Sequence, residues 1–112
     1  AFFRRAGPPT TAALPAMRAL APGMPLAFIA EEAAPGWSDH IAALGAATLH
    51  LGAAACTTEV LDEARTSGAA LRLWTVNDPS VAAAFRGPGL AGVITDDPAA
   101  FLADPDWAAW AG

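Results

Sequence analysis

The chain has 112 residues, a formal net charge of −5 and 54% hydrophobic residues, enough for one domain with its own core. Its six basic residues are all arginines and form no cluster, so nothing along the chain could neutralise a run of nucleic-acid phosphates. Alanine supplies much of the hydrophobic content, and no stretch approaches the roughly 18 consecutive apolar residues of a membrane-spanning helix. We therefore expect no nucleic-acid partner and no membrane span.

The first segment, residues 1–10, contains two prolines, one glycine and no periodic pattern, which predicts a loose or extended start. The Arg4-Arg5 pair precedes no apolar core, so the segment does not have the form of a signal peptide. The absence of an initiator Met suggests a cut or incomplete chain, and the compartment stays open. The single Cys56 can form no internal disulfide and is expected to behave as a small apolar residue.

Four strand-helix units are expected after this start. A helix over residues 11–21, stopped by Pro22-Gly23, precedes the first strand at 25–30. Ser38 is expected to cap the next helix, with Trp37 packing at its start and Gly45 ending it. The remaining units are predicted as a strand at 47–51 with a helix from Thr57 or Thr58 to Gly68, a strand at 70–76 with a helix at 79–86, and a strand at 90–95 with a helix at 98–103.

The last two units share one kind of junction, Asn77-Asp78-Pro79 in the first and Asp96-Asp97-Pro98 in the second. Proline suits the first position of a helix, and the aspartate before it can cap the free N–H groups. Asp97 is therefore expected to be a cap. Asn77 and Asp96 are expected to close the loops at the strand ends by bonding backbone amides.

Strands that alternate with helices at this spacing need crossover connections, which place the strands parallel and side by side. The pattern therefore predicts an α/β protein. Four such units fit either part of an open sheet or half of an eight-stranded barrel, and periodicity does not choose between them.

The two junctions also carry a family resemblance. The segments Trp74-Thr75-Val76-Asn77-Asp78 and Gly92-Val93-Ile94-Thr95-Asp96 resemble the C-terminal end of the glycerophosphodiester phosphodiesterase family, a TIM-barrel family. The resemblance extends over residues 12–102. It implies the C-terminal half of a TIM (β/α)8 barrel, with a partial barrel over residues 11–103. A tail over 104–112 follows, in which the helical spacing of Trp107 and Trp110 predicts a patch that packs against the barrel or a neighbour.

The resemblance also indicates what is absent. The family hydrolyses glycerophosphodiesters to an alcohol and glycerol 3-phosphate with a divalent metal, Ca²⁺ or Mg²⁺. Its chemistry rests on an early His-Arg, a Glu-x-Asp, a second His and a later Glu-x-Lys, and this sequence contains none of these motifs. No catalytic residue, no metal ligand and no cofactor are therefore assigned in this chain. It is expected to be a fragment or truncated form, inactive alone, that would act on a small phosphodiester in the complete domain.

Candidate binding residues lie at the C-terminal ends of the predicted strands, where TIM barrels place their sites. Trp74 is either a wall of the alcohol pocket or a ring that fills the barrel interior. His50 either donates to the substrate phosphate or is a partly buried imidazole satisfied by a neighbouring carbonyl. Glu31 and Glu32 are expected to be a solvated pair, because a metal role would need a third ligand that the sequence does not identify.

The expected partner is the missing N-terminal half-barrel, or a second copy of the chain that pairs through the open sheet edges at the first and last predicted strands. The alternative function is a non-catalytic half-barrel module that acts by such pairing. A third interpretation is a small independent enzyme that uses Glu31, His50 and Asp96.

Overall fold

The computed structural model describes residues 2–5, 16, 19–20, 23 and 25–110, and its strands form one parallel sheet. The strands are β1 (Phe2–Arg5), β2 (Leu26–Ala30), β3 (Thr48–Gly52), β4 (Ala70–Trp74) and β5 (Gly92–Val93). The helices are α2 (Trp37–Ala43), α3 (Thr58–Ser67), α4 (Pro79–Ala82), α5 (Pro98–Ala103) and α6 (Pro105–Ala109), with short 3₁₀ helices at Ala53–Ala55 and Ala83–Phe85. No helix in these ranges is long and apolar enough to cross a bilayer.

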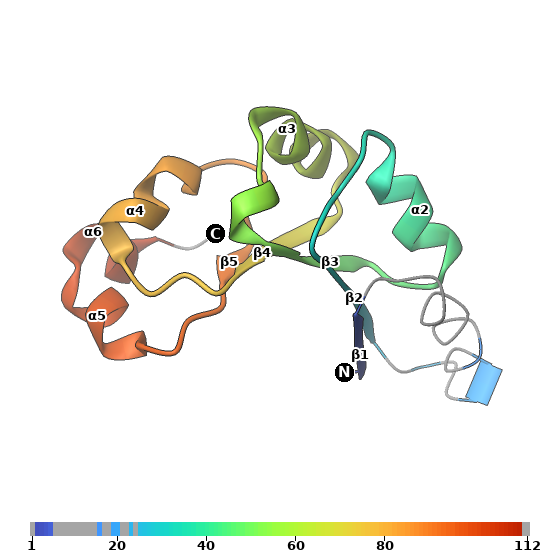
Figure 1. Cartoon of the computed structure of the whole chain (residues 1–112), viewed down its shortest axis with the longest axis horizontal. Helices are drawn as coiled ribbons and strands as arrows, with labels where there is room; N and C mark the ends of the chain where they lie inside the picture. The colour runs from blue at the N-terminus through green and yellow to red at the C-terminus, as the bar shows by residue number, and fades with distance from the viewer. Residues whose placement is uncertain (1, 6–15, 17–18, 21–22, 24, 111–112) are drawn as a thin grey trace.

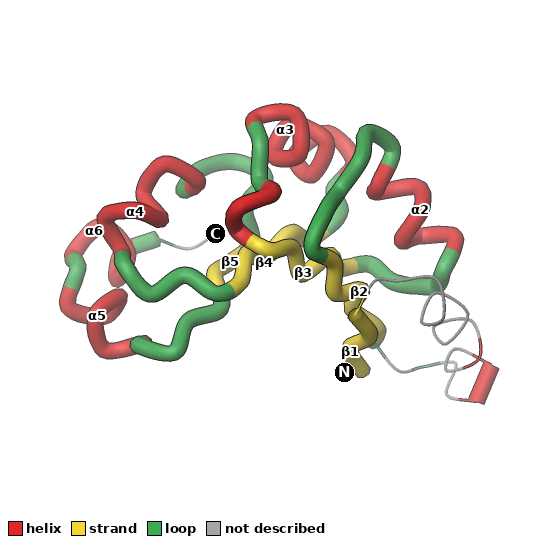
Figure 2. Tube along the Cα trace, in the orientation of Figure 1, coloured by secondary structure: helices red, strands yellow, loops and turns green. Residues whose placement is uncertain are grey.

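The sheet follows chain order, β1-β2-β3-β4-β5, and every neighbouring pair is parallel. Figure 1 shows the sheet curling, with α2 and α3 on the outside of the curve, and Figure 2 shows no described helix inside it. Strands alternating with outer helices confirm the α/β prediction and are consistent with a partial TIM barrel. The strands predicted at 70–76 and 90–95 are adjacent and parallel, as expected.

The start of the chain differs from the prediction. Residues 1–10 were expected to be loose, yet Phe2–Arg5 form strand β1, which pairs in parallel with β2 from Phe2 opposite Leu26 to Arg5 opposite Ile29. The expectation of an open edge at the first predicted strand is therefore also wrong, because among the described strands the outer position belongs to β1. The helix expected over 11–21 lies mostly outside the described residues, of which Ala16, Ala19 and Leu20 are helical.

The two faces of the sheet differ in chemistry. Alternate residues of β3 and β4, namely Leu49, Leu51, Leu71 and Leu73, are at most 2% exposed and belong to the core that packs against the helices. The residues between them point to the other side, which we call the concave face. It is formed by Ala27 and Ile29 on β2, Thr48, His50 and Gly52 on β3, Ala70, Arg72 and Trp74 on β4, and Gly92 on β5.

Three helix boundaries agree with the sequence signals. Thr57 accepts a hydrogen bond from the Val60 amide at the start of α3, and Gly68 ends that helix with a φ of 76°, a left-handed conformation that suits glycine. Asp97 accepts from the Ala100 amide at the start of α5, which confirms its capping role.

The cap of α2 is different from the one expected. Gly36, not Ser38, is its N-cap residue, and no side chain near it in sequence caps the helix. Instead, the carboxylate of Glu63 on α3 accepts from the amides of Gly36 at 2.8 Å and Ser38 at 2.6 Å. These charge-assisted bonds satisfy amides at the start of α2 and tie the two helices together.

The last two units are shorter than predicted. The helix expected at 79–86 becomes α4 followed by the 3₁₀ helix Ala83–Phe85, and β5 has only two residues instead of the six at 90–95. Backbone bonds from Ala91 to Leu71 at 2.8 Å and from Ile94 to Leu73 at 2.7 Å still extend the contact with β4. Beyond them, the expected tail contains a helix, α6, which Asp104 caps.

Trp107 of α6 is buried, as a contact role for the tail tryptophans predicts. Its ring packs edge-on against Phe101 and Trp110, and its indole N–H donates to the Pro79 carbonyl at 2.9 Å. The Arg86 guanidinium lies 5.0 Å from the centre of the same ring. The tail therefore packs against α4 and α5 of its own chain.

Candidate functional site

Trp74 ends β4 on the concave face, and its side chain turns back over β3. Its indole N–H donates to the His50 carbonyl at 3.0 Å. A Cβ built on Gly52, the residue opposite in register, would lie 3.5 Å from the Trp74 ring, so the ring rests on bare glycine backbone. The half-buried ring is thus held in a defined orientation at the C-terminal ends of two adjacent strands, the edge where barrel enzymes place their sites.

His50 lies at the middle of β3 on the same face, and the residue is 8% exposed. Burial, and in second place the positive charge of Arg72, lower the pKa of His50 below its ordinary value. The imidazole is therefore neutral at neutral pH, able to donate from one ring nitrogen and accept at the other.

Arg72 is a charged residue of the concave face that the sequence analysis did not single out. It lies directly opposite His50 in the β3–β4 register and opposite Gly92 in the β4–β5 register. A Cβ built on Gly92 would lie 3.6 Å from Arg72 Nε, so the arginine stem crosses β5 over a residue without a side chain. The sequence could have predicted this position, because Arg72 stands two residues before Trp74 and alternation along a strand places both side chains on one face.

Asn77 and Thr95 join the loops that follow β4 and β5. The Asn77 side-chain oxygen accepts from the Asp96 amide at 2.8 Å and from the Thr95 hydroxyl at 3.0 Å. Thr95 Oγ1 in turn accepts from the Asp97 amide at 3.0 Å. The expectation that Asn77 closes a strand-end loop through a backbone amide is confirmed, and Asp96 takes part through its main chain.

The residues that could form other sites are not brought together. Glu31 and Glu32 are exposed beyond the end of β2. Among the residues that the structure describes, no group of three or more His, Cys, Asp or Glu side chains could hold a metal ion. The described part of the chain thus offers no fit for the divalent metal that the resemblance implies, and no reaction step is assigned to it. Burial raises the pKa of Cys56 to about 11, which keeps the thiol protonated.

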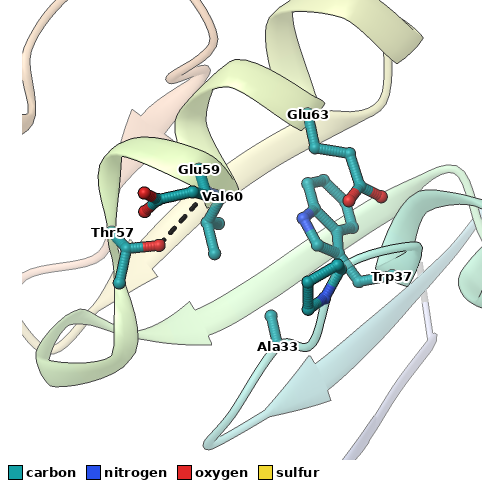
Figure 3. Close-up of a pocket in the computed structure, with 7 residues that line it drawn as sticks. Ala33, Trp37, Thr57, Glu59, Val60 and Glu63 are labelled. Atoms are coloured by element: carbon teal, nitrogen blue, oxygen red, sulfur yellow. Dashed lines mark hydrogen bonds between the residues drawn. The ribbon is translucent and has the colours of Figure 1, made fainter.

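A pocket of about 350 Å³ lies on the outer side of the sheet, between the β2–α2 loop and the start of α3 (Figure 3). The indole nitrogen of Trp37 is buried without a hydrogen-bond partner among the described residues. The carboxylates on the pocket wall repel anions, so this pocket does not suit a phosphodiester. It is lined by Ala33, Pro35, Trp37, Thr57, Glu59, Val60 and Glu63.

A curled parallel sheet with outer helices, consistent with a partial TIM barrel, is the class of structure that these observations define. The sequence matches the Glycerophosphoryl diester phosphodiesterase family over residues 9–100, and the chain belongs to that family. Comparisons with curated proteins and with solved structures gave no match.

Proposed function

We propose that the chain supplies the substrate-contacting side of a glycerophosphodiester phosphodiesterase site and is inactive without the first half of the barrel. Trp74 forms a wall for the alcohol or glycerol group, and His50 donates toward the phosphate. The observation that carries this proposal is the Trp74 indole, fixed by the His50 carbonyl at 3.0 Å on the concave face of a chain of this family.

The reaction of the complete domain is the hydrolysis of a glycerophosphodiester to an alcohol and glycerol 3-phosphate. It requires a divalent metal, Ca²⁺ or Mg²⁺, and a positioned acid for the leaving oxygen. We assign those groups to the partner half-barrel, which carries the family's His-Arg and Glu-x-Asp motifs.

Activity assays of the purified 112-residue chain and of its mixture with a family first-half barrel test this proposal. With glycerophosphocholine or bis(p-nitrophenyl) phosphate and Ca²⁺ or Mg²⁺, we expect no turnover from the chain alone and metal-dependent turnover from the mixture. Metal-dependent turnover by the chain alone would contradict the proposal. Its loss in Glu31→Ala, with His50→Ala still active, would support a small independent enzyme instead.

Trp74 variants test the wall. In the reconstituted mixture, Trp74→Phe keeps an aromatic surface but loses the bond to the His50 carbonyl, whereas Trp74→Ala loses both. We expect Trp74→Ala to raise KM at least about tenfold, and Trp74→Phe to raise it less, because apolar contact area is the main contribution. An unchanged KM in Trp74→Ala would show that the ring only fills the barrel interior.

A second candidate function is a non-catalytic half-barrel that pairs with another half-barrel or with its own copy. The observation that favours it is the position of β1 and β5 at the two edges of the described sheet, since edge strands present backbone groups for pairing. Light scattering after size-exclusion chromatography tests it: we expect a dimer or larger species at micromolar concentration. A well-dispersed 11.3 kDa monomer with a cooperative melt would count against pairing.

A further inference from the structure

Arg72 is a half-buried residue of the concave face that makes no hydrogen bond or ion pair with any residue that the structure describes. Two other arginines have partners, Arg65 with Asp62 at 3.6 Å and Arg86 with Asp106 at 3.9 Å. Arg72 makes no such contact with the part of the chain that the structure describes, although it is half-buried. Removing a charge from water without a partner is costly, so this position calls for an anion.

The Arg72 side chain lies over Gly92, a residue without a side chain, on the neighbouring strand. Gly92 stands opposite it on β5, and the Arg72 Cγ, Cδ and Nε atoms would lie 3.6–3.7 Å from a Cβ built there. The arginine therefore crosses the strand where no side chain competes for the concave face. The guanidinium is carried toward the β5 edge of the sheet, away from the helices.

The neighbours of Arg72 on this face suit an oxyanion. His50 lies opposite Arg72 on β3, and Trp74 lies two residues nearer the C-terminal end of β4. None of the concave-face residues of β2 to β5 is acidic. A ligand with one anionic group would thus meet the Arg72 cation in the middle of β4 and the Trp74 ring at the C-terminal end of that strand.

We propose that Arg72 anchors an oxyanion-binding site on the concave face and that its ligand is the phosphate group of a phosphate ester. The planar guanidinium offers a bidentate fork that fits phosphate oxygens. The choice of a phosphate ester over another oxyanion rests on the proposed function, because that function places a phosphodiester on this face.

Equilibrium binding to the 112-residue chain tests the site, with inorganic phosphate, glycerol 3-phosphate and glycerophosphocholine as separate probes at matched ionic strength. We expect Arg72→Gln to weaken binding of all three at least about tenfold, because it removes a charge-assisted pair of hydrogen bonds. Arg72→Lys should retain part of the affinity as a point charge. Arg65→Gln, on the outer surface of α3, is the matched control and should bind like the natural chain.

A second variant covers the case in which Arg72→Gln fails to fold. Gly92→Asp leaves Arg72 in place but puts a carboxylate beside its guanidinium, and the 3.6 Å contact leaves room for the added Cβ. We expect it to abolish phosphate binding while circular dichroism shows a folded chain. Unchanged binding in either folded variant, or no binding of any probe by the natural chain, would overturn the proposal.

The three probes separate this proposal from the proposed function. Binding of inorganic phosphate and glycerol 3-phosphate through Arg72, with no binding of glycerophosphocholine, would support the oxyanion site and count against a diester substrate. Glycerophosphocholine binding that is unaffected by Arg72→Gln would overturn the role of Arg72 and leave the proposed function standing.

Discussion

The two faces of β3 and β4 are built from alternating residues of the same strands, yet they serve different purposes. The helix side is a closed apolar layer in which Leu51, Leu71 and Leu73 have no exposed surface. The concave side presents His50, Arg72 and Trp74, a histidine, a cation and an aromatic ring. The comparison shows that two strands of five residues each can place core side chains on one face and polar and aromatic side chains on the other.

The largest expected effect is on the helix side. Leu71→Ala should lower the free energy of unfolding by about 2–5 kcal/mol, because it removes a fully buried side chain and leaves a cavity. Thr48→Ala, at a half-buried position of the concave face, is the control and should cost less than about 1 kcal/mol. Urea unfolding measures both, and equal losses would remove the distinction between the two faces.

A smaller effect is expected from the hydrogen bonds between the Glu63 carboxylate on α3 and the amides at the start of α2. Glu63→Gln should cost about 1 kcal/mol, because a neutral amide caps the α2 amides less strongly than a carboxylate. Glu59→Gln, on the same helix without such bonds, is the matched control. An equal loss of unfolding free energy in Glu59→Gln and Glu63→Gln would show that the negative charge of α3, and not the hydrogen bonds of Glu63 to α2, stabilises the fold.

The same carboxylate predicts an acid dependence. Burial raises the pKa of Glu63, but hydrogen bonds from Ser38 and from the Gly36 amide outweigh it, and the net pKa is lowered. The ionised Glu63 therefore stabilises the fold fully at pH values above the pKa of glutamate in the unfolded chain. This stabilisation is lost as the pH falls from that pKa to the lower pKa of Glu63 in the folded chain. Urea midpoints of the natural chain and Glu63→Gln should converge in acid.

The smallest expected effect concerns the concave face. Because burial and Arg72 lower the pKa of His50, the unfolded chain binds a proton more readily than the folded one. Stability should therefore fall as the pH drops from above the ordinary histidine pKa toward the lower folded value. His50→Gln should reduce this slope between pH 7.5 and 5.5. An identical slope in His50→Gln would contradict the effect.

Sequence signals predicted the features that depend on neighbouring residues. Thr57, Gly68 and Asp97 act within one helical turn, and the apolar runs of β2 to β4 were located to within two residues because the strands are buried. The Glu63 cap of α2 could not be read in this way. Its carboxylate reaches amides 25 and 27 residues away, and only the packing of two helices brings them together.

The remaining differences have the same physical origin. β1 is four residues long and has no alternation to distinguish it from a loop, so its pairing with β2 defines it. α6 has five residues, too few to form without the Asp104 cap and the packing of Trp107. At the candidate site, the end-of-strand positions of Trp74 and Asn77 were predictable, whereas the role of Gly92 beside Arg72 required the register between β4 and β5.

The order of the strands has a consequence for how the chain forms. Every described strand pairs only with strands that directly precede or follow it in the sequence. A nascent chain can therefore complete each pairing as soon as the next crossover has emerged, without waiting for its C-terminus. Such stepwise growth keeps loop closures short and favours fast assembly relative to folds that join distant segments. It also makes the chain extendable, since another unit can be added at either edge without rearranging those already in place.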